Sequence, residues 1–385
     1  MKKLLFINGH MDAGGVEKSL LDILRHLDYS TYEVDLLLLE RIGDYGSEIP
    51  EQVHIYVNSL EDTYGSPVQS LLRCIQKGNW TAFRIRLILL VMKLFGQRWI
   101  RLAGKLLTGD RQYDCVIGFR PGVCTQVAAF AAKGTRRLTW WHHGAINVDR
   151  GYPECASVCD QVVVVSEACR RMLAETFPAL EDRLEVIPNM VDVEVIRRKA
   201  KRGHPYTVEP GLLHLVTLCR LSPEKHVENV FPAVQRLKDI GLSFQWHIVG
   251  GGASEVLLRQ EAEAAGITDV VCFEGNQPDP YPYLGQADLF VHPSYVESQG
   301  LVVLEAMALG VPCVVTRSLG PCEFIQDGVN GVLTEQDPSS LAEKVEQMLT
   351  DPELYARIKK NTHCPRQFLP EQVMEQIDRL LGGDR

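Results

Sequence analysis

The segment Glu297-Ser298-Gln299-Gly300-Leu301-Val302-Val303-Leu304-Glu305 carries two acidic side chains separated by seven residues. An apolar run, Leu289–Val291, precedes it and predicts a buried strand, whereas Leu301–Leu309 predicts a helix. A glycine at the start of a helix leaves backbone N–H groups open to a phosphate. Glu297 and Glu305 stand on either side of those donors, so their carboxylates can reach hydroxyl groups of a bound ligand. The segment therefore predicts one strand–loop–helix unit of an α/β protein.

Similar apolar runs occur before and after this segment and predict the remaining strands. They are Lys3–Asn8, Val34–Leu39, Cys115–Phe119, Arg137–Trp141 and Val162–Val165 in the first half, and Leu212–Leu218, Phe244–Val249, Val270–Phe273 and Cys313–Val315 in the second. Runs that are apolar on both faces and separated by helices are typical of a parallel sheet covered on both sides. The sequence therefore predicts an α/β protein with two Rossmann-like parallel-sheet domains that face a central cleft.

Two prolines and a glycine between His204 and Gly211 interrupt the alternation and predict an interdomain linker. We expect a first domain at 1–203 and a second at 204–365. Residues 366–385 are expected to form a C-terminal helix that packs back toward the first domain.

The composition narrows the class of function. Of the 385 residues 45% are hydrophobic and 23% are charged, which is typical of a globular protein. The net charge of −9 argues against nucleic acid as a partner. The 11 cysteines show no paired spacing, so we expect free thiols and no metal site. The apolar run Leu4–Ile7 is too short for a signal peptide, and a cytoplasmic location is expected.

The interval 73–105 is unusual because it contains eight basic residues and no acidic one. Aliphatic and aromatic residues lie between the charges. Such a composition suits a helix that lies on an anionic membrane surface, here the inner leaflet. It suits equally a pair of solvated surface helices that cover a sheet.

Three further motifs follow predicted strands. Gly14-Gly15 precedes a predicted helix and could bind a phosphate there, or could only allow a tight turn from strand to helix. His142 and His143 could bind a polar ligand or move a proton, or could be ordinary histidines at the edge of the core. Arg220 and Lys225 lie five residues apart on a loop and suit the two phosphates of a diphosphate, although loop cations are often only solvated.

Taken together, these motifs resemble the GT-B glycosyltransferases of the large retaining family 4. The hallmark of that family is a pair of glutamates separated by seven residues, which Glu297 and Glu305 match. Further similar stretches are Gly275–Gln277, His292–Glu297, Ile187–Asp192, Gly328–Gly331 and Gly14–Ser19, the last resembling capsule, exopolysaccharide and cell-wall members. One residue departs from the pattern, because His226 follows Lys225 where the family usually has glycine.

The resemblance implies a role for each matched position. Arg220 and Lys225 would neutralise the leaving diphosphate, Glu305 would hold the ribose and Glu297 would contact the transferred sugar. His143 would contact the sugar and the donor phosphate, with His142 as the alternative. The donor-binding set is Gly14, Gly15, Arg220, Lys225, Ser298, Gln299, Gly300, Leu301, Val302 and Glu305, and the catalytic set is Glu297, His143, Arg220 and Lys225.

The implied reaction is retaining transfer of a sugar from a nucleotide sugar, with UDP-sugar preferred, to a glycan or polyprenyl-lipid-linked acceptor at the cell surface. Because no Asp-x-Asp pair lies near the Arg220 loop, no metal and no cofactor are expected. The alternatives are a sugar-nucleotide epimerase on the same double-Rossmann plan and a non-catalytic nucleotide-sugar-binding subunit.

Overall fold

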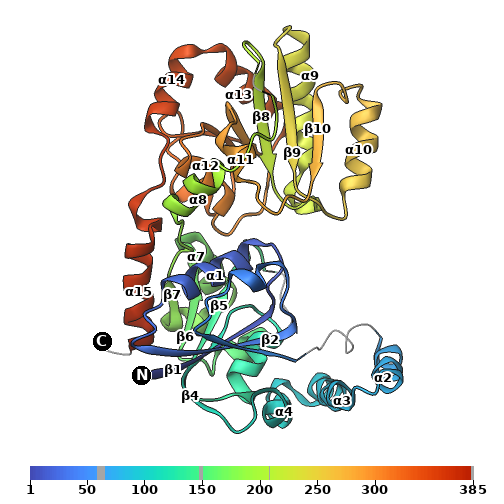
Figure 1. Cartoon of the computed structure of the whole chain (residues 1–385), viewed down its shortest axis with the longest axis vertical. Coiled ribbons are helices and arrows are strands. Elements are labelled where there is room, and N and C mark those ends of the chain that lie inside the picture. Colours follow the sequence, from blue (N-terminus) through green and yellow to red (C-terminus); the bar gives the residue numbers. More distant parts are fainter. Residues whose placement is uncertain (59–65, 147–150, 208, 383–385) are drawn as a thin grey trace. The chain divides into compact units, whose positions relative to one another are not determined.

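The computed structural model describes residues 1–58, 66–146, 151–207 and 209–382. Its contacts divide the chain into two units, one of Met1–Met190 with Val373–Arg385 and one of Val191–Gln372. Each unit contains one parallel β-sheet with helices packed on it (Figure 1).

The sheet of the first unit has the strand order β3-β2-β1-β4-β5-β6-β7, and all of its neighbouring strands pair in parallel. The strands are β1 Lys2–His10, β2 Tyr32–Arg41, β3 Val53–Val57, β4 Gln112–Gly118, β5 Lys133–Trp141, β6 Gln161–Val164 and β7 Leu184–Val186. Alternate residues of β1 enter different apolar clusters: Leu4 and Phe6 enter one, Leu5 and Ile7 the other. Both faces of this sheet are therefore buried, as the uniformly apolar strands predict.

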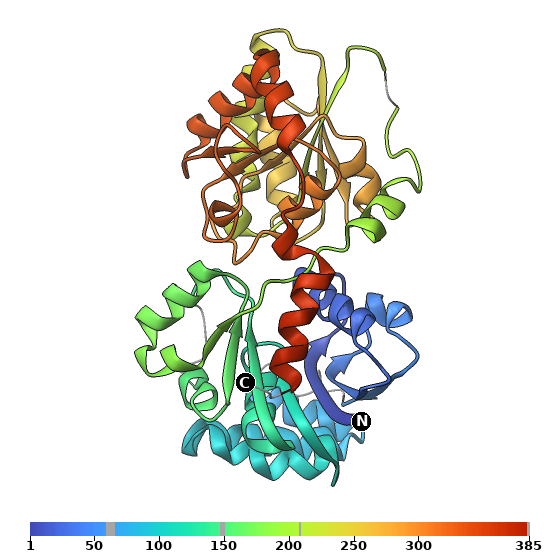
Figure 2. The same cartoon turned by 90° about the vertical axis from the view of Figure 1, so that its left-hand side faces the viewer.

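The helices of the first unit come from both ends of the chain. They are α1 Gly15–His26, α2 Pro67–Gln76, α3 Trp80–Phe95, α4 Gly104–Thr108, α5 Val123–Gln126, α6 Tyr152–Ala156, α7 Glu167–Thr176 and, from the C-terminal end, α15 Pro370–Gly382. Val373, Ile377 and Leu380 of α15 belong to the same apolar cluster as Leu4 of β1. Figure 2 shows α15 (red) beside the strands of this unit.

The sheet of the second unit has the strand order β10-β9-β8-β11-β12-β13. The strands are β8 Leu213–Leu218, β9 Phe244–Val249, β10 Val271–Gly275, β11 Leu289–His292, β12 Cys313–Thr316 and β13 Val332–Thr334. The helices are α8 Val193–Ala200, α9 Phe231–Asp239, α10 Glu255–Ala264, α11 Tyr281–Gly285, α12 Leu301–Ala308, α13 Pro338–Thr350 and α14 Pro352–Asn361. Separate apolar clusters cover the two faces of the sheet.

Strand order reverses once in each sheet. In the second unit the chain passes from β8 outward through β9 and β10, and then returns to β11 on the other side of β8. In the first unit the same reversal separates β1 from β4. Ligands of open α/β sheets bind beyond the carboxyl ends of the strands at such a reversal. The loops after β1, β4, β8 and β11 are therefore the places to look for a site.

The division between the units differs from the predicted linker. The first unit ends at Met190, not at residue 203, because α8 packs with the second unit. Ile196 of α8 lies in an apolar cluster with Val216 of β8, and the Val191 N–H donates to the Phe368 carbonyl at 2.7 Å. The proline-containing segment between α8 and β8 is thus a loop within the second unit.

Candidate functional site

The loops after β8 and β11 bring together two charged residues that are distant in the sequence. Lys225 Nζ donates to Glu297 Oε1 at 2.6 Å. Their side chains are 19% and 13% exposed, so the pair is largely shielded from water but is still reachable. Both residues follow strands at the strand-order reversal of the second sheet, where open α/β sheets bind ligands.

A third residue, His292 at the end of β11, completes this cluster. Its Nε2 lies 2.7 Å from the same Glu297 oxygen, Oε1, and its side chain is buried. Burial alone raises the pKa of Glu297, but the hydrogen bond from His292 and the charges of His292 and Lys225 outweigh it and lower the pKa to about 2. Glu297 is therefore a carboxylate at neutral pH.

The second oxygen of Glu297 is available for a ligand. Among the described residues Oε2 accepts no hydrogen bond, whereas Oε1 has two partners. A carboxylate fixed through one oxygen can direct the other at a substrate hydroxyl without reorganising. His292 lies in one of the motifs of the sequence, but the sequence assigns it no role. Its contact with Glu297 follows from the packing of β11 against its own loop.

Arg220 supplies a second cation on the loop after β8. Its side chain is exposed and makes no hydrogen bond or ion pair with the parts of the chain that the structure describes. Lys225, by contrast, is already paired with Glu297. Arg220 is therefore the cation of this loop that is open to an anionic ligand.

Backbone N–H groups lie at the start of α12. Gly300 caps the helix with φ +82°, a left-handed conformation that favours glycine. The N–H groups of Leu301 and Val302 have no hydrogen-bond partner within the described residues. The loop after β12 supports this turn, since the Gly320 N–H donates to the Glu297 carbonyl at 3.2 Å. A Cβ on Gly320 would lie 2.3 Å from Cα of Gln299.

Glu305, the second acid of the motif, is buried in α12. Tyr281 of α11 donates a hydrogen bond from its hydroxyl to Glu305 Oε1 at 3.1 Å. Sequence reasoning does not find Tyr281, because nothing in its local pattern links it to a residue 24 positions later. The contact fixes the carboxylate one to two turns from the amides of Leu301 and Val302.

His226 has the only positive φ among the described residues other than glycine, with φ 47° and ψ 46°. This is the left-handed conformation that glycine adopts without strain. The His226 ring packs on Tyr295, with centroids 3.9 Å apart, and the Asn229 side chain donates to the Tyr295 hydroxyl at 2.9 Å. His226 thus holds a conformation that costs glycine nothing, and its ring packs on Tyr295 while it does so.

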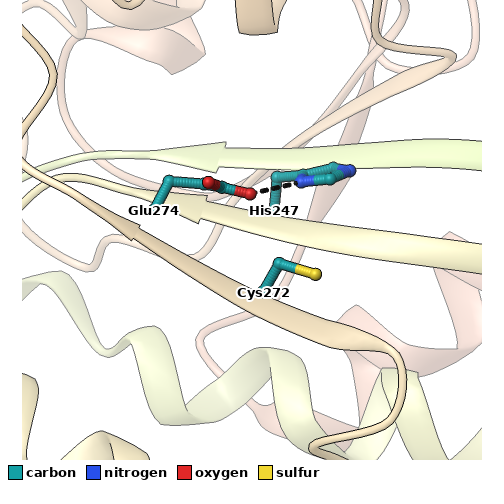
Figure 3. A group of neighbouring side chains, drawn as sticks. All are labelled: His247, Cys272 and Glu274. Carbon is teal, nitrogen blue, oxygen red and sulfur yellow. Dashed lines mark hydrogen bonds and ion pairs between the residues drawn. The ribbon is translucent and has the colours of Figure 1, made fainter. Parts of the chain in front are cut away.

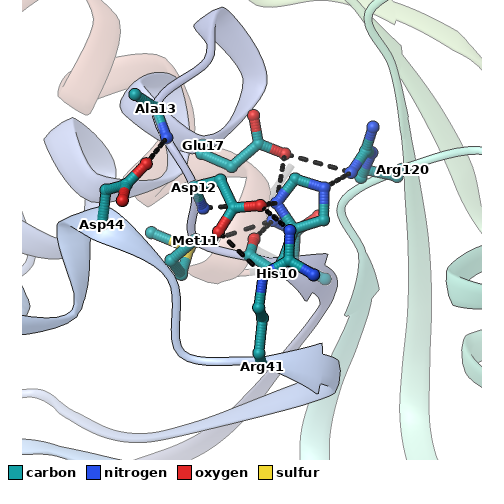
Figure 4. Close-up of polar contacts among 9 residues, drawn as sticks. His10, Met11, Asp12, Ala13, Glu17, Arg41, Asp44 and Arg120 are labelled. Atoms are coloured by element: carbon teal, nitrogen blue, oxygen red, sulfur yellow. Dashed lines mark hydrogen bonds and ion pairs between the residues drawn. The ribbon is translucent and has the colours of Figure 1, made fainter. Parts of the chain in front are cut away.

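The first unit has a polar network at its own strand-order reversal (Figure 4). Arg120, after β4, lies 3.2 Å from His10 Nε2 and 3.1 Å from Oε1 of the buried Glu17 in α1. A hydrogen bond from Arg41 lowers the pKa of Asp12, which follows β1. Gly14 and Gly15 follow after Ala13; Gly14 caps α1, and Gly15, its first residue, is exposed. Sequence reasoning predicts the two glycines but not the charged residues beside them.

The two candidate histidines differ in exposure. His142 is buried against Phe119, and burial lowers its pKa to about 3, so its ring is neutral. His143 is exposed at the end of β5, where its carbonyl accepts a hydrogen bond from the Trp141 indole at 2.6 Å. Of the two, His143 is the side chain that a ligand in solution can reach.

Two Rossmann-like units with sites at their strand-order reversals define a GT-B protein, and the comparisons agree. Anabaena HepE, solved with UDP, superposes with a TM-score of 0.69 at 19% identity and 100% coverage of both chains. TarM of S. aureus, solved as a mutant with UDP, superposes with a TM-score of 0.73 at 15% identity over 99% of this chain and 100% of that one. At these identities the likeness concerns the fold.

The sequence comparisons give the family. Residues 13–195 match the profile of Glycosyltransferase Family 4, and residues 209–363 match that of Glycosyl transferases group 1. The chain belongs to glycosyltransferase family 4.

Two curated relatives cover only part of the chain. The lipopolysaccharide core biosynthesis glycosyltransferase LpsE of Rhizobium meliloti is 30% identical over 54% of this chain and 62% of its own length. The N-acetyl-alpha-D-glucosaminyl L-malate synthase of Bacillus anthracis is 28% identical over 57% of this chain and 60% of its own. The alignments thus span about three fifths of these relatives.

Proposed function

We propose that the protein is a retaining glycosyltransferase that moves a sugar from a nucleotide sugar, preferably a UDP-sugar, to a glycan or lipid-linked acceptor. The observation that carries the proposal is the Lys225–Glu297–His292 cluster beside the open N–H groups of α12. Cleavage of a sugar–phosphate bond places negative charge on the diphosphate and positive charge on the sugar carbon. The cluster offers groups for both charges.

Each group has a task in this reaction. Arg220 and Lys225 stabilise the leaving diphosphate, together with the N–H groups of Leu301 and Val302. Oε2 of Glu297 accepts a hydrogen bond from a sugar hydroxyl. Glu305, held by Tyr281, binds the ribose hydroxyls. Because these donors and cations belong to the chain itself, we propose that transfer needs no divalent metal.

The first unit contributes the remaining groups of the proposal. His143 is the exposed histidine at the end of β5, and we assign to it the contact with the sugar and donor phosphate. The start of α1, with Gly14 and Gly15, offers a second set of helix N–H groups to the phosphates. Relatives named for lipopolysaccharide synthesis and neighbours solved with UDP support the choice of acceptor and donor class.

A panel of UDP- and GDP-sugars tests the proposal. Slow hydrolysis of one donor, followed by NMR, should identify the nucleotide and the sugar, and EDTA should leave the rate unchanged. The anomeric signal of the transferred sugar should match that of the donor. Conversion of the donor to an epimer without release of nucleotide would instead identify an epimerase, and no binding to any donor by calorimetry would identify a non-catalytic chain.

We also propose that residues 67–105 dock on an anionic membrane surface. Helix α3 buries Ile85, Leu89 and Met92 against the first sheet. Its opposite face is also apolar: Trp80 is 60%, Leu87 42% and Leu94 77% exposed. These three residues recur every seven positions and therefore lie on one side of the helix.

The residues around that face are basic and apolar. Exposed apolar residues continue on α2 and beyond α3, at Val68, Leu72, Ile75, Phe95 and Leu102. Exposed basic residues lie among them, at Lys77, Arg84, Lys93, Arg98, Arg101 and Lys105. Arg86 is buried and bonded to Ser70, so it is not part of this surface. A solvated helix exposes polar residues, whereas a basic and apolar face suits anionic lipid.

Membrane docking agrees with the proposed acceptor, because a lipid-linked glycan is presented at a bilayer surface. No helix in the described residues is long and apolar enough to cross a membrane.

A further inference from the structure

Three potential metal ligands lie together on the second sheet (Figure 3). His247 is on β9, and Cys272 and Glu274 are on β10, the edge strand. The register pairs Cys272 with His247. Because residues two apart on a strand point to the same face, all three side chains share one face of the sheet.

The ligand atoms of these residues are close enough to share an ion. The His247 ring nitrogen, the Cys272 sulfur and a Glu274 oxygen all lie within 4.8 Å of one another. In the structure His247 Nδ1 lies 2.7 Å from Glu274 Oε1. Imidazole, thiolate and carboxylate are the three ligand types of protein zinc sites. Three protein ligands leave one tetrahedral position for water.

A second layer of residues holds the ligands in place. His214 Nδ1 lies 3.1 Å from His247 Nε2, and the Tyr283 hydroxyl donates to Glu274 Oε2 at 3.2 Å. Tyr206 stacks on both imidazoles, with centroids 4.0 Å from the His214 ring and 4.4 Å from the His247 ring. Partners of this kind orient metal-binding histidines and carboxylates and strengthen binding.

We propose that His247 Nδ1, Cys272 Sγ and Glu274 bind a zinc-class divalent cation that ties the edge strand β10 to β9. On binding, the thiol proton of Cys272 is released to solvent as the metal–sulfur bond forms. The proton of His247 then resides on Nε2 and is donated to His214 Nδ1. Lys225 and Glu297 follow other strands, β8 and β11, and the role proposed for the ion is structural.

Titration of the chelator-treated full chain with Zn²⁺ in a calorimeter tests the site. We expect one saturable site per chain and a rise in the melting temperature on loading. Cys272→Ser should weaken binding at least tenfold and abolish the rise. Cys322→Ser, which removes an exposed free thiol of the same unit, is the matched control and should behave as the unaltered protein.

Co²⁺ gives an independent readout, since a cobalt–thiolate bond produces a charge-transfer absorption in the near ultraviolet. The band should appear with the unaltered chain and with Cys322→Ser, and should be missing in Cys272→Ser. Glu274→Gln, which keeps a polar partner for Tyr283, should retain the band but weaken Zn²⁺ binding. Absence of saturable binding, equal affinity in Cys272→Ser, or loss of binding in Cys322→Ser each overturns the proposal.

Discussion

Lys225 and Glu297, 72 residues apart in the sequence, form a short ion pair. The same carboxylate oxygen, Oε1, also contacts Nε2 of His292. The pair joins the loop of β8 to the loop of β11. It holds Glu297 by one oxygen and leaves the other for a ligand. Arg220 remains the exposed cation.

Removal of the Lys225 cation should slow donor cleavage. Lys225→Ala is expected to lower kcat/KM for donor hydrolysis by roughly 10²–10³-fold, the scale for losing one preorganised electrostatic contact. Because Lys225 and Glu297 act as a unit, the double variant with Glu297→Ala should lose less than the product of the single losses. Lys238→Ala, which breaks the surface pair with Asp269, is the control and should change the rate less than twofold. Unchanged turnover in Lys225→Ala contradicts the assignment.

Protonation of Glu297 should be visible in stability. Its folded pKa is lowered from 4.5 to about 2, so ionised Glu297 stabilises the fold above pH 4.5, and that stability is lost as the pH falls toward 2. Glu297→Gln should lower the free energy of unfolding by on the order of 3 kcal/mol at pH 7. In urea titrations the difference from the unaltered protein should shrink below pH 4.5.

The control for this titration is Glu335→Gln, which removes an exposed carboxylate paired with Arg317. Such a surface pair contributes about 0–1 kcal/mol. The neutral, buried His142 makes the whole protein less stable as the pH falls below 6.5, but it does so equally in both proteins and cancels in the difference. A pH-independent difference for Glu297→Gln contradicts the lowered pKa.

The left-handed conformation of His226 sets a preference for glycine at that position. The free energy of unfolding of His226→Gly should lie within about 1 kcal/mol of that of the unaltered protein, because relief of strain offsets the lost packing on Tyr295. His226→Val should be less stable than His226→Gly by roughly 1–2 kcal/mol, since a branched side chain is strained at positive φ. At Glu228, which lies in a right-handed helical turn, glycine should have no such advantage over valine.

A methyl group at Gly320 should displace the loop that carries Glu297. The added Cβ would meet the backbone of Gln299 at 2.3 Å, so Gly320→Ala is expected to cost roughly 1–3 kcal/mol of stability and to slow donor hydrolysis. Gly251→Ala adds the same methyl where the nearest atom is 3.5 Å away and should keep its stability within about 0.5 kcal/mol. Equal melting temperatures for the two variants exclude this close approach.

Membrane docking predicts flotation with anionic vesicles at low salt. Leu94→Glu should lower the bound fraction several-fold, because it places a charge on the exposed apolar face of α3. Leu257→Glu on α10, where an exposed leucine lies in the second unit, is the matched control and should not change it. Because the attraction to anionic lipid is partly electrostatic, raised salt should weaken binding, and neutral vesicles should bind poorly. Absence of flotation at low salt removes the proposal.

The sequence predicts the strands well and the partners of the site residues poorly. Uniformly apolar runs such as Leu289–Val291 fall in strands, because burial on both faces leaves a strong signal. The strands β3, β7 and β13 are not predicted. Each lies at an edge of its sheet, and most residues of β3 and β7 are not buried, so these two strands lack a uniformly apolar run.

Spacing along the chain similarly identifies Glu297 and Glu305 but not what touches them. His292, Tyr281 and Gly320 reach these residues through tertiary packing, which no local pattern encodes. The boundary at 203 fails for the same reason: proline and glycine mark a loop, and only the packing of α8 decides to which unit the loop belongs.

The return of α15 to the first sheet has a consequence for synthesis on the ribosome. Domains usually fold in the order in which they emerge, the amino-terminal one first. Here the second unit is one continuous stretch, whereas the first lacks Val373, Ile377 and Leu380 until the whole second unit has been made. The second unit can therefore complete its folding first. Until α15 is made, part of the apolar surface of the first unit stays uncovered, and chaperones bind such surfaces.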